Sequence, residues 1–209
     1  MIKYEIDIKK TALLVYDMMN DFIKPGFPRE DPEIRKILVP KIKKLIEHCR
    51  SKGVPIIYAI HTYRSNGADM GLMAITISGI KDGKSFLKGS EGVKVYDEIK
   101  PQENDIIIEK HRYSAFYGSD LDLILRGMEK DTLIVTGYST NIGCETTTRD
   151  ATNMGYKVIF PSDGSLARDL PDKGWGAVSS EEIRKVVLSI LAHRFAMVLS
   201  IDELISKLQ

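Results

Sequence analysis

The stretch Ala12-Leu13-Leu14-Val15-Tyr16-Asp17 joins a run of apolar residues to a single carboxylate. A run this continuous is typical of a strand that is buried on both faces of a parallel sheet. Comparable apolar runs occupy residues 55–60, 106–108, 133–136, 156–160 and 196–199. Because stretches with helical spacing separate these runs, the sequence predicts a three-layer α/β fold with a doubly wound, mainly parallel sheet.

Apolar spacing and capping signals predict helices between and after the strands. Ser119 with Asp122 three residues later predicts a helix start, and Ser200 with Glu203 predicts another. The expected helices cover residues 39–52, about 119–130, 144–154, 180–194 and a short stretch after Ser200. Residues 64–93 are irregular and rich in glycine, and we expect them to form a mobile lid or an interface segment.

The composition predicts one soluble domain over residues 1–209, without a global charge that would attract nucleic acid or anionic membranes. Lys+Arg number 30 and Asp+Glu number 29, giving a formal net charge of +1. No uncharged apolar run approaches the ~20 residues that a membrane span needs, and the N-terminal residues do not resemble a signal peptide. With only two cysteines, a disulfide framework is not expected. We therefore expect a cytoplasmic protein.

Unusual groups follow three of the predicted strands. Asp17 and Lys110 each end an apolar run, and the turn at Gly143-Cys144 follows a third. Ligands of doubly wound folds bind at the carboxyl ends of the strands, where these groups would meet. A carboxylate beside an ammonium in a crevice has the perturbed proton affinity that acid–base catalysis needs. A structural salt bridge is the alternative interpretation of the pair.

The turn from Gly137 to Cys144 lies between a predicted strand and a predicted helix. Backbone amides at a helix start can bind a carbonyl oxygen or a developing oxyanion. Cys144 lies near that start and, if close to Lys110, would have a lowered pKa and act as a nucleophile. Alternatively, Cys144 is a small buried hydrophobic residue.

Three segments resemble the motifs of isochorismatase-like hydrolases, in the order and at the spacing of that family. The first, residues 13–22, is similar to a motif containing D-M-Q-N-D-F, with Met19 in place of Gln. The second, residues 110–116, resembles K-x-R-Y-S-A-F, and the third spans residues 137–151. The resemblance implies the α/β fold, a hydrolase active on a small molecule, and a homodimer or higher homo-oligomer.

One departure from the family pattern affects the expected mechanism. The family's nucleophilic cysteine aligns with Gly143, and Cys144 comes one residue later. One residue along a helix turns a side chain by about 100°, so Cys144 is not a simple substitute. The Gly-Cys pair resembles true isochorismatases, which hydrolyse a vinyl ether with Asp as general acid and no thiol. By that resemblance, Asp17 is the acid, and Lys110 orients it or holds a substrate carboxylate.

The resemblance also suggests residues that bind substrate. His61 and Arg64 are candidates for an anionic group, Tyr113 and Phe116 for an apolar wall, and the amides of Ser139 and Gly143 for polarising the substrate. Surface positions for His61 and Arg64, and core positions for the two aromatic residues, are the alternatives. The metal-binding pattern of nicotinamidases is not matched, because no second histidine follows His61 before His111. We expect neither a metal nor another cofactor.

Three functional hypotheses follow. The first is thiol-independent hydrolysis of an enol ether or related small acid by Asp17 and Lys110. The second is a C–N amidohydrolase, acting on an amide or N-carbamoyl substrate, that uses Cys144 after a local shift. The third is a catalytically silent relative that binds a ligand or serves as a scaffold.

Overall fold

The computed structural model describes residues 2–209 and contains a seven-stranded sheet in the order β3-β2-β1-β4-β5-β7, with β6 paired to β4. All of these strand pairs are parallel. The strands are β1 (Thr11–Tyr16), β2 (Ile56–His61), β3 (Ile106–Lys110), β4 (Thr132–Tyr138), β5 (Lys157–Pro161), β6 (Ser165–Leu166) and β7 (Met197–Leu199). The predicted fold class is confirmed.

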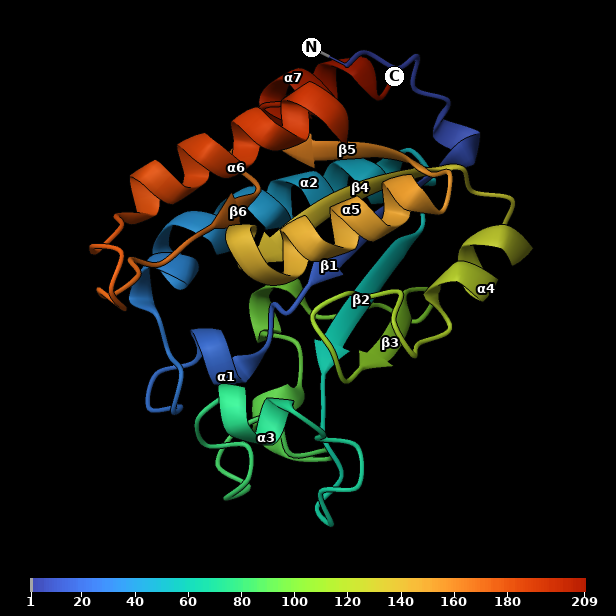
Figure 1. Cartoon of the computed structure of the whole chain (residues 1–209). Coiled ribbons are helices and arrows are strands. Elements are labelled where there is room, and N and C mark those ends of the chain that lie inside the picture. The colour runs from blue at the N-terminus through green and yellow to red at the C-terminus, as the bar shows by residue number, and fades with distance from the viewer. Residues whose placement is uncertain (1) are drawn as a thin grey trace.

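Helices cover both faces of the sheet, as Figure 1 shows. The α-helices are α1 (Asn20–Ile23), α2 (Val39–Ser51), α3 (Met73–Thr76), α4 (Leu121–Gly127), α5 (Glu145–Asn153), α6 (Ser180–Arg194) and α7 (Ile201–Lys207). A π-helical turn, Thr140–Cys144, leads directly into α5. Residues from α2 and α7 share a core with one face of the sheet, and residues from α4, α5 and α6 share a core with the other.

Alternate residues of the central strand β1 supply the two cores. Leu13 and Val15 pack toward α2 and α7, whereas Leu14 and Tyr16 pack toward α4, α5 and α6. Every residue of β1 is buried. Burial on both faces explains why the sequence of this strand is continuously apolar rather than alternating.

The structure corrects one helix start and adds one strand. Asp120, and not Ser119, immediately precedes α4. The Ser119 hydroxyl accepts from the Leu121 amide at 3.2 Å and donates to the Ala115 carbonyl oxygen 2.5 Å away. The predicted start of α6 at Ser180 is confirmed, and Ser179 caps this helix by a reciprocal capping box with Glu182. The predicted cap of α7 by Ser200 and Glu203 is confirmed. The two-residue strand β6 is too short to produce a periodic signal.

Irregular segments gather beyond the carboxyl ends of β1 and β2, together with α1 and α3 (Figure 1). The glycine-rich residues 64–93 belong to this region and bury several apolar side chains, among them Met70, Ile80 and Phe86. The segment is therefore packed against the rest of the protein at several points. No helix within residues 2–209 is long and apolar enough to cross a membrane.

Gly137 allows the two central strands to approach each other at the carboxyl edge. It has a φ of +127° and pairs with Tyr16 across the β1–β4 ladder. A Cβ atom at this position would lie 2.0 Å from the Tyr16 carbonyl oxygen. Since that oxygen belongs to the backbone of a central strand, it cannot move aside as a flexible side chain would.

We expect Gly137→Ala to lower the free energy of unfolding by about 2–4 kcal/mol, because it adds backbone strain and a steric clash. Gly127→Ala is a matched control, since a Cβ atom there meets nothing within 4 Å. Alanine in a helix is favoured over glycine, so the control should be neutral or stabilised by up to about 1 kcal/mol. Urea denaturation measures both, and equal stability of the two variants would contradict the close approach at Gly137.

Candidate active site

Asp17 and Lys110 meet at the carboxyl edge of the sheet, although β2 separates their strands. Lys110 Nζ lies 2.9 Å from Asp17 Oδ2, and both side chains are almost completely buried. Asp17 has a φ of +51°, which is uncommon outside glycine and turns the chain sharply at the end of β1. The Lys110 ammonium also lies 4.2 Å from the centroid of the Tyr16 ring. The ammonium is thus held between a carboxylate and an aromatic face.

Burial dominates the electrostatics of this pair. It raises the pKa of Asp17 to about 6, because loss of water disfavours the carboxylate more than Lys110 favours it. Burial also lowers the pKa of Lys110, while the nearby Asp17 acts in the opposite direction. Within residues 2–209, Asp17 Oδ1 is buried without a hydrogen-bond partner, whereas Oδ2 accepts from Lys110. The carboxyl group can therefore carry a proton near neutral pH.

His61 ends β2, between the strands that supply the ion pair. Its Nδ1 is 3.9 Å from Asp17 Oδ2, and its Nε2 is 2.7 Å from the Tyr63 hydroxyl. The imidazole stacks on the Phe86 ring, with 5.0 Å between centroids. Burial, followed by the charge of Lys110, lowers the pKa of His61 well below its usual value. His61 is therefore neutral at physiological pH.

A cavity of about 240 Å³ opens next to Asp17. Its walls combine aromatic rings, the turn after β4, the loop after α1, and the segment that follows α3. The lining residues are Tyr16, Asp17, Phe22, Arg29, His61, Thr76, Ile77, Ser78, Phe86, Tyr113, Tyr138, Ser139, Ile142, Gly143 and Arg168. The cavity thus contains Asp17, His61, Tyr113, Ser139 and Gly143 from the residues that the sequence singled out.

Two arginines in the cavity wall were not predicted from the sequence. The Arg29 guanidinium lies 5.3 Å from the Phe86 ring centroid, and its Nε is buried without a hydrogen-bond partner among the described residues. Arg168 lies over the Tyr138 ring and donates to Asp31 and to the Arg29 carbonyl oxygen. Both come from irregular segments, where no periodicity or motif marks a residue that faces a site. They place positive charge in the cavity wall.

Gly143 and Cys144 face different parts of the molecule. Gly143 lines the cavity, and a Cβ atom on it would lie 2.2 Å from the Tyr16 ring. Cys144 is fully buried in the core shared with α4, α5 and α6, and is not among the lining residues. Burial raises the pKa of the Cys144 thiol, although Lys110 has the opposite effect. The thiol is therefore protonated and inaccessible in this structure.

Two residues expected to bind substrate lie elsewhere. Arg64 is exposed and pairs with Asp69, because Tyr63, one residue earlier, is the side chain that turns inward. Phe116 packs in the core against Tyr156, with 5.6 Å between ring centroids. Neither residue lines the cavity beside Asp17. Their expected roles in substrate binding stay predictions.

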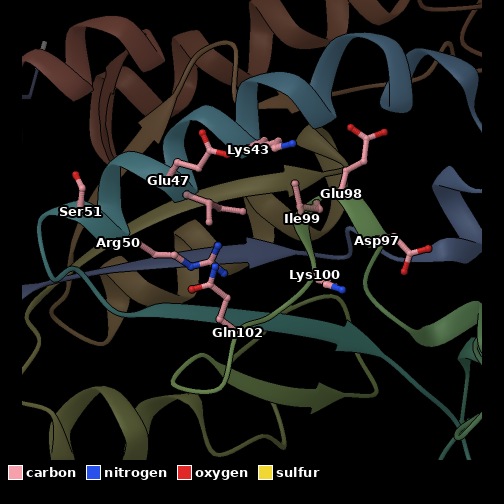
Figure 2. Close-up of a pocket in the computed structure, with 10 residues that line it drawn as sticks. Lys43, Glu47, Arg50, Ser51, Asp97, Glu98, Ile99, Lys100 and Gln102 are labelled. Carbon is pink, nitrogen blue, oxygen red and sulfur yellow. The ribbon is translucent and has the colours of Figure 1, made fainter.

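A second hollow, of about 610 Å³, lies along the outside of α2 and is shown in Figure 2. Its wall carries both signs of charge, from Lys43, Arg50 and Lys100 and from Glu47, Asp97 and Glu98. Arg50 is already paired with Asp105. The acidic residues of this hollow are not buried as Asp17 is in the other cavity. Within residues 2–209, no three or more His, Cys, Asp or Glu side chains are grouped so that they could hold a metal ion.

A family model described as "Isochorismatase domain" matches residues 11–203. The chain belongs to the isochorismatase family of hydrolases. Asp17, Lys110 and the turn at Gly143 all lie within the matched range, as do the strands β1 to β7. Family membership therefore covers both the fold and the candidate site.

Relatives within the isochorismatase family carry different names. N-carbamoylsarcosine amidase of Arthrobacter sp is 34% identical over 157 residues, covering 74% of this chain and 58% of that protein. An isochorismatase of Bacillus subtilis (strain 168) is 28% identical and covers 97% of this chain, which spans 59% of it. The crystal structure of a cysteine hydrolase from Pseudomonas syringae pv. phaseolicola 1448A has a TM-score of 0.94 at 35% identity, covering 99% of this chain and 96% of that one. The type of bond that is cleaved must be inferred from the site.

We expect both cysteines to be unreactive in the native protein, because Cys49 and Cys144 are buried and burial raises the pKa of both thiols. Titration with Ellman's reagent should detect no fast thiol before unfolding and both thiols in guanidinium chloride. One equivalent of fast native reaction that Cys144→Ala abolishes and Cys49→Ala preserves would contradict the buried placement of Cys144.

Proposed function

We propose that this isochorismatase-family protein hydrolyses a small anionic molecule, an enol ether or a related acid, with Asp17 as general acid and without a thiol nucleophile. The observation that carries the proposal is the state of Asp17. Its carboxyl group lines the cavity, has a pKa of about 6, and keeps Oδ1 free of any partner while Lys110 holds Oδ2. A protonated carboxyl in this position can deliver a proton to a bound substrate.

On an enol ether, the reaction starts with proton transfer from Asp17 to the terminal carbon of the double bond. The carbon attached to the ether oxygen becomes electrophilic, and a water molecule adds to it. The water returns one proton to the Asp17 carboxylate, and the resulting hemiketal breaks down to an alcohol and a ketone. Overall, the reaction consumes one water molecule and restores the protonated Asp17 carboxyl group.

Lys110 acts in this scheme as a positioning residue. It is fully buried and is not among the residues that line the cavity. Its ammonium fixes Oδ2, so that Oδ1 is the oxygen that exchanges protons with the substrate. The same positive charge stabilises the carboxylate that exists after the proton has left.

The shape and charge of the cavity support an anionic substrate with a flat, apolar part. Phe22, Phe86 and Tyr138 supply aromatic walls, and Arg29 and Arg168 supply positive charge. Arg29 lines the cavity, its Nη1 donates to the Ser78 carbonyl oxygen, and its buried Nε has no partner among residues 2–209. A substrate carboxylate is the partner that we propose for this guanidinium. Arginine is well suited to carboxylates because its donors are planar and fixed.

The amidohydrolase hypothesis is supported by the relatives named as amidases. It requires Cys144 to leave the core and reach the cavity after a shift of the turn that contains it. The third hypothesis, a silent relative, is consistent with the absence of a side chain at Gly143. Substitutions at Asp17 and Cys144 separate all three.

We expect Asp17→Asn to lower kcat/KM by about 10²–10⁴-fold, the usual contribution of a general acid. Cys144→Ala should leave kcat/KM close to that of the wild type. Assays use isochorismate and a panel of small amides and N-carbamoyl compounds, and Cys49→Ala is the control for removing a buried thiol. Loss of amide hydrolysis in Cys144→Ala would favour the amidohydrolase, and no turnover of any substrate would favour the silent relative.

The pH dependence gives a separate test of the role of Asp17. Since the acid form is required, kcat/KM should be constant below pH about 6 and should fall by about tenfold per pH unit above it. Cys144→Ala should show the same profile. A rate that rises through this pH range would indicate that Asp17 acts as a base, as a thiol mechanism needs.

A further inference from the structure

Tyr16 is a buried residue of the site that the proposed mechanism does not use. It ends β1 directly before Asp17, and only 1% of its surface is exposed. Its hydroxyl donates to the carbonyl oxygen of Tyr113, and the face of its ring lies under the Lys110 ammonium. The side chain is thus held at three places: the strand, the hydroxyl and the ring face.

The ring of Tyr16 occupies the space beside Gly143. A Cβ atom added to Gly143 would lie 2.2 Å from Cε1 of the ring and 2.3 Å from both Cζ and the hydroxyl oxygen. Contacts between non-bonded heavy atoms are optimal at about 3.5–4.0 Å. Any side chain at position 143 would therefore overlap with the ring.

The ring cannot simply swing aside. Rotating it would break the hydrogen bond to Tyr113 and remove the aromatic face from Lys110. An ammonium over an aromatic face is attracted by the ring, and more strongly when water is excluded. Tyr16 belongs to the same buried core cluster as Leu14, Val135 and Cys144. Tyr16 and Gly143 are therefore sterically coupled.

We propose that Tyr16 is a specificity-determining residue: its ring takes the place of a side chain at position 143, so that Asp17 and Lys110 act only on substrates attacked by water. Substrates that need a covalent acyl intermediate are excluded, because no nucleophile fits beside the ion pair. The specificity rests on the proposed function, but the steric coupling does not. The two parts can be tested separately.

The first test measures the coupling by stability, in a Cys144→Ala background. Gly143→Cys should lower the melting temperature, and adding Tyr16→Val should recover part of the loss. Tyr16→Phe is the matched control because it keeps the ring and removes only the hydroxyl, so Tyr16→Phe/Gly143→Cys should not recover. The proposal would be overturned if Gly143→Cys did not lower the melting temperature while Tyr16 is present. It would also be overturned if Tyr16→Phe and Tyr16→Val recovered the melting temperature equally.

The same variants are tested by thiol chemistry, which needs no knowledge of the natural substrate. A thiol at position 143 beside Lys110 should have a lowered pKa. Each unit by which the pKa falls raises the thiolate fraction about tenfold near neutral pH. Iodoacetamide should therefore alkylate folded Tyr16→Val/Gly143→Cys at least about tenfold faster than Tyr16→Phe/Gly143→Cys. Equal rates in the two double variants would overturn the proposal.

If the cysteine variants do not fold, a double-mutant cycle with the smaller alanine side chain at position 143 tests the same coupling. Gly143→Ala should destabilise the protein more in the presence of Tyr16 than in a Tyr16→Leu background, as measured by urea denaturation. Additive effects of the two substitutions would overturn the steric coupling.

The specificity itself is tested with p-nitrophenyl acetate. In folded Tyr16→Val/Gly143→Cys, the thiolate sulfur should bond to the acetyl carbon as p-nitrophenolate leaves, giving a burst of one equivalent per site. The wild type should give none. A burst in the wild type would overturn the exclusion of covalent chemistry, whereas failure of the proposed acid mechanism would appear only in the Asp17 variants and the pH profile.

Discussion

The Asp17 carboxylate and the Lys110 ammonium lie 2.9 Å apart in a region almost closed to water. Removing two charges from water costs several kcal/mol per ion, and their attraction compensates only when the geometry is good. The surrounding structure supplies that geometry. The strand β2 sets the separation of β1 and β3, and the Tyr16 ring supports the ammonium. The raised pKa of Asp17 shows that the compensation is incomplete, which is the property that an acid catalyst needs.

Most of the fold could be predicted from the sequence because its strands are buried on both faces. Both faces of such a strand are buried, so its sequence is a continuous apolar run, as in residues 12–16, and is easy to recognise. The start of α4 was harder to predict, since Ser119 lies one residue before Asp120, the residue that precedes the helix. Serine can cap a helix or bond to a neighbouring carbonyl, and only the final backbone geometry decides which occurs.

The candidate site was partly predictable for a similar physical reason. Asp17 and Lys110 end parallel strands, so topology alone brings them to one edge. Arg29 and Arg168 come from irregular segments whose path depends on tertiary contacts, and no pattern in the sequence points to them. Arg64 lies outside the cavity because Tyr63, its neighbour, is the side chain that faces inward. Phe116 is an aromatic residue of the core, which sequence alone does not distinguish from a pocket wall.

The central position of β1 has a consequence for the synthesis of the chain. It pairs with β2 on one side and with β4 on the other, and β4 begins about 120 residues later. At a translation rate of about 5–20 residues per second, roughly 6–24 seconds pass before β4 leaves the ribosome. During that interval a central strand of the sheet has at least one open edge. Until residues 132–138 are made, that edge is open to pairing with another strand.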